Sequence, residues 1–397
     1  MKYIELKKDL YWIGAVDHGL REFDVVLNAA MGTTYNSYLV IGSEKTAIID
    51  TVKANMIEDY LSKLDELVDI KKVDYLIVNH AEPDHTGSIS RLLELNPNLI
   101  IVGSNRAIQN VKDITNMEFT NITAKEGTTL SLGNKTFTFY NAIMLHWPDT
   151  IYTYLKEDKA LFTCDSFGTH YALDVPLQSK IENEEEYQES FHYYFDKIFS
   201  PFKSFYLKAI KKIENLDIDI LCVGHGPILD ENPWKIINYT KKLAMIDNNN
   251  IKPLIIIPYV TSYGYTEDLA KRIKEELLKE NFNVEMYNMT FNKTEDVMER
   301  LIIADGILVG SPTILGDALL PIWKLLIRLN PFEHGIKKGS VFGSYGWSGE
   351  GINNVDTRLK QLKMKTIPPF KIKFKASKDD LQNLNDYIKE FVELMKK

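Results

Sequence analysis

The stretch VNHAEPDHTGS, residues 78–88, decides how the rest of the chain is interpreted. It continues an apolar run, residues 73–80, that is typical of a buried strand. Six of its residues contain two histidines and two carboxylates: His80, Glu82, Asp84 and His85. Side chains spaced two residues apart in an extended or turning segment can converge on one or two metal ions. The stretch therefore predicts a metal-binding loop at the end of a strand, and the plainer alternative is a polar surface turn.

The composition is that of a globular protein from a reducing compartment. The chain has 397 residues, 45% of them hydrophobic and 26% charged, and this length is enough for two domains. A net charge of −8 and a pI near 5.6 argue against nucleic-acid binding, which usually needs a basic face. Cys164 and Cys222 are the only cysteines, so we expect neither a disulfide framework nor a CxxC metal site.

The chain shows no sign of a membrane or of export. Residues 1–16 alternate charged and apolar side chains and lack the continuous apolar segment of a signal peptide. No run of about 18 apolar residues occurs, so no membrane-spanning helix is expected. Together with the two cysteines, these features predict a cytoplasmic protein.

The first part of the chain reads as short strands whose ends carry metal-binding types of side chain. Apolar runs at 9–16, 36–42 and 45–51 predict adjacent strands, and 56–70 has the 3.6-residue period of a helix. Further strands are expected at 73–80 before the loop, at 98–104, at 135–150 ending at His146, at 160–170 ending at Asp165, and at 218–228 around His225. Four separated strands therefore deliver these residues to what we expect to be one edge.

The last part alternates strands and helices regularly, which is the pattern of a doubly wound parallel sheet. Asn248 to Asn250 and Pro253 mark the join, so we expect domains at 1–250 and 251–397. Five strands are predicted, at 253–260, 283–290, 306–313, 340–346 and 370–376, with helices such as 266–280 and 378–397. Five such strands suggest a flavodoxin-like domain.

The histidine loop, with residues beyond it, carries a family resemblance. The series His80-x-Glu82-x-Asp84-His85, then His146, Asp165 and His225, resembles in type, order and spacing the ligand set of flavodiiron proteins, also called A-type flavoproteins. The resemblance covers nearly the whole chain. It implies an α+β and α/β architecture: an N-terminal metallo-β-lactamase-like αββα sandwich followed by a C-terminal flavodoxin-like doubly wound parallel sheet.

The resemblance also implies how two irons would be held. One iron would take His80, Glu82 and His146, the other would take Asp84, His85 and His225, and Asp165 would bridge them. A water takes the position of His85 in some family members. Zinc hydrolases of the same scaffold carry HxHxDH here, and Glu82 replaces their second histidine with a harder, anionic ligand that favours iron.

Three other positions near the implied site are more ambiguous. His170, five residues beyond Asp165, is expected to support a ligand rather than to bind metal itself. At His18 and Asp24 the chain departs from a family segment that lines the outer part of the gas pocket. His18, His192 and His334 have no metal-binding context.

Three loops at strand ends in the last part predict a flavin site. The turn after the first strand combines hydroxyls, a glycine and a helix N-terminus, which suits one phosphate. The loops after the third and fourth strands lie where doubly wound sheets bind ligands. The candidate residues are Thr261, Ser262, Tyr263, Gly264, Tyr265, Thr266, Pro312, Thr313, Ile314, Leu315, Gly316, Ser344, Tyr345, Gly346 and Trp347. No GxGxxG fingerprint is present, which favours FMN over NAD or FAD.

The resemblance implies an oxidoreductase that takes electrons through FMN to the diiron site. It would reduce dioxygen to water, nitric oxide to nitrous oxide, or both, and the sequence does not rank the two gases. The implied assembly is a head-to-tail homodimer or a dimer of dimers, with rubredoxin or a reduced deazaflavin coenzyme as donor. Two rival classes remain: a zinc hydrolase joined to a flavodoxin-like module, and an electron carrier with a vestigial first domain.

Overall fold

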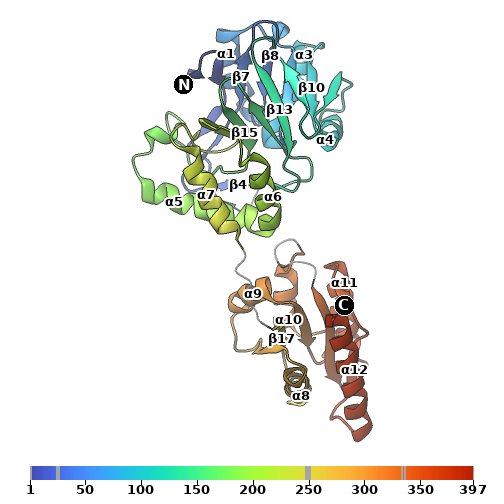
Figure 1. Cartoon of the computed structure of the whole chain (residues 1–397). Helices are drawn as coiled ribbons and strands as arrows, with labels where there is room; N and C mark the ends of the chain where they lie inside the picture. The colour runs from blue at the N-terminus through green and yellow to red at the C-terminus, as the bar shows by residue number, and fades with distance from the viewer. Residues whose placement is uncertain (1, 24–26, 246–251, 332–333, 335–336, 397) are drawn as a thin grey trace. The chain divides into compact units, whose positions relative to one another are not determined.

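The computed structural model describes residues 2–23, 27–245, 252–331, 334 and 337–396 (Figure 1). The chain forms two compact units, Met1–Ile246 and Asp247–Lys397. The expected join at Asn248 to Asn250, and with it the expected boundary between residues 250 and 251, lies outside the described residues, as does Asp24.

Two β-sheets form the centre of the first unit. The seven-stranded sheet has the order β1 (Ile4–Lys7), β2 (Leu10–Trp12), β7 (Tyr38–Ile41), β8 (Thr46–Ile49), β9 (Tyr75–Val78), β10 (Ile100–Gly103) and β11 (Asn121–Thr123). The five-stranded sheet has the order β12 (Thr129–Ser131), β13 (Thr136–Asn141), β14 (Ile151–Leu155), β15 (Ala160–Cys164) and β16 (Ile220–Val223). Two small pairs join β3 (Ala15–Asp17) to β6 (Thr33–Tyr35) and β4 (Glu22–Phe23) to β5 (Leu27–Asn28).

The two sheets pack face to face between two layers of helices (Figure 1). Their facing sides form one apolar cluster, in which Trp12, Ile49 and Phe162 are fully buried. The outer side of the larger sheet packs on α1 (Ile57–Leu67), α3 (Ile89–Leu95) and α4 (Asn105–Thr115). The outer side of the smaller sheet packs on α5 (Glu184–Tyr194), α6 (Lys203–Ile213) and α7 (Pro233–Ala244). The expected αββα sandwich is confirmed.

The second unit is a parallel sheet with helices on both faces. Its strands run β18 (Asn283–Asn288), β17 (Leu254–Tyr259), β19 (Gly306–Gly310), β20 (Lys338–Tyr345) and β21 (Lys365–Thr366), and β22 (Phe370–Lys373) also pairs with β20. One face packs on α9 (Thr294–Ile303), α10 (Leu320–Arg328) and α11 (Glu350–Gln361), and the other on α8 (Tyr265–Lys279) and α12 (Lys378–Lys396). This order reverses direction at β17, as in flavodoxin-like folds, which confirms the expected class.

Two local expectations about the first unit are wrong. The strand expected to end at His146 ends at Asn141, because the chain then turns: the Leu145 amide donates to the Ala142 carbonyl (3.1 Å). The histidine loop does not share one sheet edge with the other candidates, since β9 belongs to the larger sheet and β15 and β16 to the smaller. The site therefore lies where the ends of two packed sheets meet.

None of the described helices combines the length and apolar character needed to cross a bilayer.

Candidate metal and flavin sites

The histidine loop turns sharply just after β9. Glu82 is the N-cap of α2 (Pro83–Thr86), and Pro83 occupies its first position, where a missing backbone donor costs nothing. The His85 amide donates to the Glu82 carbonyl (3.0 Å). This single turn of helix contains Asp84 and His85, whereas His80 and Glu82 precede it. The loop therefore contributes to two neighbouring clusters.

The first cluster joins two histidines to two carboxylates. Glu82 Oε2 lies 3.1 Å from His80 Nε2 and 2.9 Å from His146 Nε2. Asp165 Oδ2 lies 3.5 Å from each of the same two nitrogens. One metal ion would be within reach of all four side chains, since their ligand atoms lie within 4.8 Å of one another.

The second cluster uses the other oxygen of the same aspartate. Asp165 Oδ1 lies 2.9 Å from His85 Nε2 and 3.4 Å from His225 Nε2. Asp84 Oδ2 lies 3.1 Å from His225 Nε2 and 3.5 Å from His85 Nε2. Asp165 thus presents one oxygen to each cluster, which is the arrangement of a carboxylate that bridges two metal ions.

In each cluster the imidazole nitrogens and carboxylate oxygens converge on a shared centre, and they do not fully satisfy one another by hydrogen bonds. Both oxygens of Asp84 and Oδ2 of Asp165 are buried without a hydrogen-bond partner, although imidazole nitrogens approach them closely. A buried carboxylate oxygen without a partner is costly. Four imidazoles and three carboxylates that converge in this way fit a pair of cations, and this mixed set suits iron.

The charges of the metal-free clusters depend on one another. Burial alone would lower the pKa of His85, but the nearby Asp84 and Asp165 outweigh it and raise that pKa to about 10. Burial likewise opposes, but does not prevent, a rise of the His146 pKa to about 9, which the adjacent carboxylates of Asp165 and Glu82 cause. Burial would raise the pKa of Asp165, yet His85 and His146 hold it well below its usual range. The metal-free site therefore holds imidazolium groups against carboxylates.

Residues that the sequence interpretation did not consider fix the orientation of the ligand candidates. Asp149 Oδ2 lies 3.2 Å from His80 Nδ1 and accepts a 2.7 Å hydrogen bond from the Ala81 amide. His225 Nδ1 donates to the Thr34 carbonyl (2.6 Å). Asp149 could have been predicted from the sequence, because it is a carboxylate three residues after the candidate ligand His146. Thr34 could not, because it lies in a strand that is distant in the sequence.

Cys164 is a further neighbour that the sequence interpretation passed over. Its sulfur lies within 4.8 Å of ligand atoms of His85 and Asp165. Burial, together with the charge of Asp165, raises the pKa of the thiol well above its usual range. Cys164 therefore stays a neutral thiol beside the metal-free site.

His170 lies against the second cluster without joining it. Its ring is 5.1 Å from that of His225 and 4.4 Å from that of Phe23, measured between centroids. Its Nδ1 contacts Thr33 Oγ1 at 2.9 Å. Burial and the nearby His225 lower the pKa of His170 to about 3, so the ring is neutral. His18 is exposed and pairs with Asp174 (3.1 Å), away from both clusters.

In the second unit, a cavity of about 330 Å³ opens at the carboxyl ends of β17, β19 and β20. It is lined by Ser262, Tyr263, Tyr265, Pro312, Thr313, Ile314, Leu315, Ser344, Tyr345, Gly346, Trp347 and Phe374. Trp347 and Leu315 are 91% and 95% exposed, and Thr313 Oγ1 is buried without a hydrogen-bond partner. Exposed apolar side chains around a cavity with an unpaired hydroxyl fit a planar, partly polar ring such as isoalloxazine.

Four expected flavin residues do not line this cavity. Thr261, Gly264 and Thr266 shape the turn into α8 instead: Thr261 Oγ1 accepts from the Gly264 amide (3.0 Å), and Gly264 has a φ of +87°. Thr266 is buried, with its Oγ1 3.0 Å from Ser344 Oγ. Gly316 lies in the turn beyond Leu315 with a φ of +78°. Phe374, which does line the cavity, lay in a predicted strand and was not considered.

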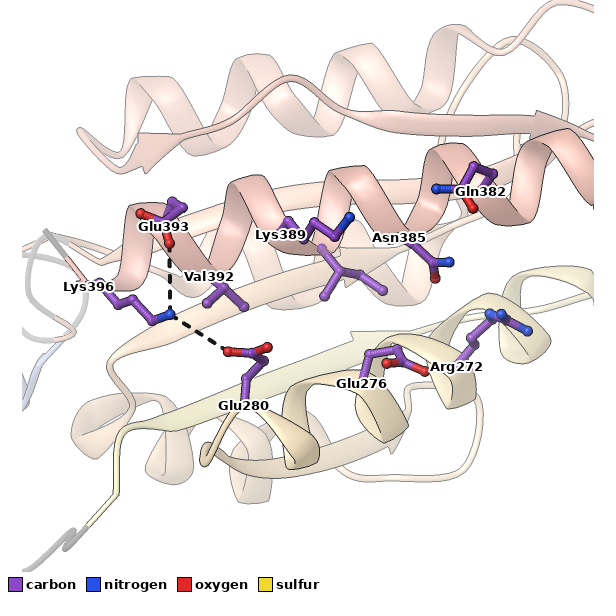
Figure 2. Close-up of a pocket in the computed structure, with 10 residues that line it drawn as sticks. Arg272, Glu276, Glu280, Gln382, Asn385, Lys389, Val392, Glu393 and Lys396 are labelled. Atoms are coloured by element: carbon purple, nitrogen blue, oxygen red, sulfur yellow. Dashed lines mark ion pairs between the residues drawn. The ribbon is translucent and has the colours of Figure 1, made fainter.

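Figure 2 shows another depression of the second unit, a groove of about 460 Å³ between α8 and α12. It begins at Arg272, about two helical turns from Tyr265 at the flavin end of α8. Lys396 Nζ lies 3.7 Å from a Glu280 oxygen and 3.8 Å from a Glu393 oxygen. Lys396 is therefore paired within the groove, and none of the residues that line the groove also lines the flavin cavity.

Known proteins resemble the chain in both units. A sequence model of the ODP family beta lactamase matches residues 33–226, and one of Flavodoxin matches residues 257–385. The flavo-diiron protein FprA2 of Clostridium acetobutylicum is 36% identical, covering 98% of this chain and 99% of that one. The nitric oxide reductase of Moorella thermoacetica is 33% identical over 92% of this chain and 91% of its own. The solved rubredoxin oxygen:oxidoreductase of Desulfovibrio gigas has a TM-score of 0.63 at 27% identity, covering 100% of this chain and 99% of that one.

Fold and sites together define a class of protein: a β-lactamase-like unit with two adjoining clusters of side chains able to bind metal, joined to a flavodoxin-like unit. Two relatives that span nearly the whole chain carry the name of one such family. The chain belongs to the flavodiiron proteins, also called A-type flavoproteins.

Proposed function

We propose that this chain is an oxidoreductase that passes electrons from FMN to a diiron site and there reduces dioxygen to water, nitric oxide to nitrous oxide, or both. The observation that carries the proposal is Asp165, which offers one oxygen to each of two histidine and carboxylate clusters. A bridging carboxylate holds two metal ions close enough to act on one small substrate.

One iron would be held by His80, Glu82 and His146, and the other by Asp84, His85 and His225, with Asp165 between them. Iron bound here would supply the redox chemistry at which a small gas is reduced. Asp149 and the Thr34 carbonyl would keep the imidazoles of His80 and His225 aimed at the metal through their second ring nitrogens. His170 and Phe23 would close the side of the second cluster against bulk water.

FMN would occupy the cavity at the carboxyl ends of β17, β19 and β20. The phosphate would lie at the N-terminus of α8, near Thr261 and Ser262, where backbone amides and the helix dipole favour an anion. The ring would lie between the loop of Pro312 to Leu315 and the loop of Ser344 to Trp347, with Tyr263 and Phe374 at its edge. Flavin bound here would exchange electrons singly or in pairs.

The donor, assembly and location complete the proposal. The Desulfovibrio relative is named for oxidation of rubredoxin, so a rubredoxin-type donor is the first choice and a reduced deazaflavin coenzyme the second. The proposed assembly is a head-to-tail homodimer or a dimer of such dimers, in which the FMN of one chain serves the irons of its partner. Cys164 and Cys222 are free thiols, which supports a cytoplasmic location. The proposed domains are residues 1–250 and 251–397.

Relatives named for nitric oxide and for dioxygen both match the chain, so the two gases are the alternatives to separate. The test is anaerobic stopped-flow and steady-state turnover of the iron- and FMN-loaded protein, with the same reductant for each gas. Faster dioxygen consumption to water identifies an oxygen reductase, and dominant nitrous oxide formation identifies a nitric oxide reductase. No turnover with either gas would refute the proposal. Two zinc ions and no iron would restore the hydrolase alternative, and a first domain that stays metal-free after anaerobic iron loading would favour the electron carrier.

A further inference from the structure

A run of lysines follows the free edge of the second unit's sheet. Between Gln361 and Lys378 the chain contains six lysines and no aspartate or glutamate, although its net charge is −8. These residues are Lys363, Lys365, Lys371, Lys373, Lys375 and Lys378, and we call them the lysine strip. All six are exposed. Within the described part of the chain none of them has a carboxylate oxygen within 4.0 Å, whereas nearby Lys360 is paired with Asp356.

The strip is continuous in space because β21 and β22 pair with the same strand. Lys365 lies opposite Lys338, and Lys373 lies opposite Tyr345, at the two ends of β20. Seven residue steps along β20 correspond to about 23 Å. This length is close to the width of a small protein–protein contact and exceeds what a single small molecule would cover.

One end of the strip reaches the flavin cavity. Phe374, between Lys373 and Lys375, is 54% exposed and lines the cavity. Its amide donates to the Tyr345 carbonyl (2.9 Å), and a Cβ on Gly346 would lie 2.7 Å from its ring. A protein seated on the strip would therefore touch the rim of the flavin cavity.

Lysines on an edge strand also discourage pairing with other sheets, and this alternative explains Lys365, Lys371 and Lys373. It does not explain Lys363, Lys375 and Lys378, which lie outside β21 and β22. Nor does it explain why acidic residues are missing from the whole segment. Acidic side chains lie only at the borders of the segment: Glu350 interacts with Lys371, Asp268 lines a small adjoining cavity with Lys375, and Asp379 and Asp380 directly follow Lys378.

We propose that the lysine strip is the docking surface for a small acidic one-electron redox protein that reduces FMN. This inference rests on the proposed function and specifies its electron donor. Two docked donors in turn, each oxidised by one electron, would reduce one FMN by two electrons with uptake of two protons from solvent. Attraction between the strip and an acidic partner would raise the association rate and make it fall with salt.

The test uses the full-length protein loaded with iron and FMN, and reduced rubredoxin as the acidic probe. The flavin absorbance is followed by stopped flow under anaerobic conditions at several ionic strengths. The first variant combines Lys371→Glu, Lys373→Glu and Lys375→Glu, and the second combines Lys363→Glu and Lys365→Glu at the end remote from the flavin. Lys293→Glu with Lys324→Glu, exposed lysines outside the strip, gives the same charge change as the second variant.

We expect each strip variant to be reduced by rubredoxin about 10-fold to 100-fold more slowly at low salt, with a flatter salt dependence. The Lys293 and Lys324 control is expected to stay within about twofold of the wild type. Reduction by reduced methyl viologen, a small cation, is expected to be unchanged or faster in all variants, and this measurement shows that the flavin site is intact.

Three outcomes would overturn the docking proposal. The first is an unchanged rate of reduction by rubredoxin in both strip variants, and the second is an equal loss of the reduction rates by rubredoxin and by viologen. The third is a change of oligomeric state in the strip variants, which would make the strip a contact between copies of the chain. Failure of the proposed function looks different: wild-type protein reduced with a stoichiometric amount of viologen would then form no nitrous oxide from nitric oxide and would not reduce dioxygen to water.

Discussion

Among single residues, Asp165 decides whether the two clusters act as one site. It directly follows β15, and its two oxygens face different pairs of histidines. A monodentate side chain such as asparagine offers only one good oxygen ligand and no charge. The residue therefore controls both the number of ions held and the charge that compensates them.

We expect Asp165→Asn to retain at most one iron per chain and to lose at least about 100-fold of its gas-reducing turnover, because the second cluster loses its shared anionic ligand. The measurements are iron content after desalting and turnover with each gas. Asp217→Asn, on the surface beside Lys159, is the matched control and should keep both. Two irons and wild-type turnover in Asp165→Asn would contradict the bridging role.

Protonation of the histidines gives a second prediction at this scale. His80, His85 and His146 all have a raised pKa in the metal-free protein, His85 to about 10 and His146 to about 9. A metal ion binds only the neutral imidazole, so loading with iron at neutral pH should release about three protons per chain. A pH indicator in weak buffer during anaerobic iron addition measures this release.

The sign of the pH dependence follows from the same shifts. The raised pKa of His85 and of His146 stabilises the folded metal-free protein fully below about pH 6.5, and this stabilisation is lost as the pH rises through about 9 and about 10. Proton release on iron binding should decline over the same upper range. A release that does not change between neutral pH and pH of about 10 would show that other groups supply the protons.

Between elements, the close approach of β15 and β16 shapes the second cluster. Gly224 follows β16, and its amide donates to the Cys164 carbonyl (2.6 Å) at the end of β15. A Cβ at Gly224 would lie 2.9 Å from His85 Cε1 and 2.9 Å from the Cys164 carbonyl carbon. Only a residue without a side chain leaves room for the His85 ring here.

We therefore expect Gly224→Ala to displace His85 and to weaken iron binding in the second cluster about 10-fold to 100-fold, while the first cluster keeps its iron. Iron retained against a graded series of chelator concentrations measures this effect. Gly19→Ala, where the nearest atom to the new Cβ is 3.4 Å away, is the control for an added methyl group. Equal retention in both variants would mean that His85 does not need this space or does not bind iron.

The strands show what the sequence could and could not predict. Local signals were sufficient for the loop after β9, because its metal-binding residues are neighbours in the chain and follow an apolar run. His146 was assigned to a strand because the strand was extended through it, although Pro148 and Asp149, just beyond it, are typical turn residues. Thr34 and Phe374 were missed because their roles depend on contacts with residues far away in the sequence. The periodicity of apolar residues predicts single elements, but it does not show which distant segments of the chain come together.

In the whole molecule, the flavin cavity and the metal clusters belong to different compact units. Electrons must therefore pass from one unit to another, either within a chain or between two chains. A head-to-tail homodimer predicts the second route, because electrons would then pass from the FMN of each chain to the irons of its partner. The two routes are distinguished by placing the defects on separate chains.

We expect a purified heterodimer of an Asp165→Asn chain and a Ser262→Asp chain to have about half the activity of the wild-type dimer, since one FMN and one iron pair remain on opposite chains. Ser262→Asp puts a carboxylate at the rim of the flavin cavity, where it would repel the phosphate. Two affinity tags in co-expressed chains isolate the heterodimer, and each homodimer of a single variant should be inactive. If electrons pass within one chain, the heterodimer will be as inactive as the homodimers, because neither chain then holds both cofactors.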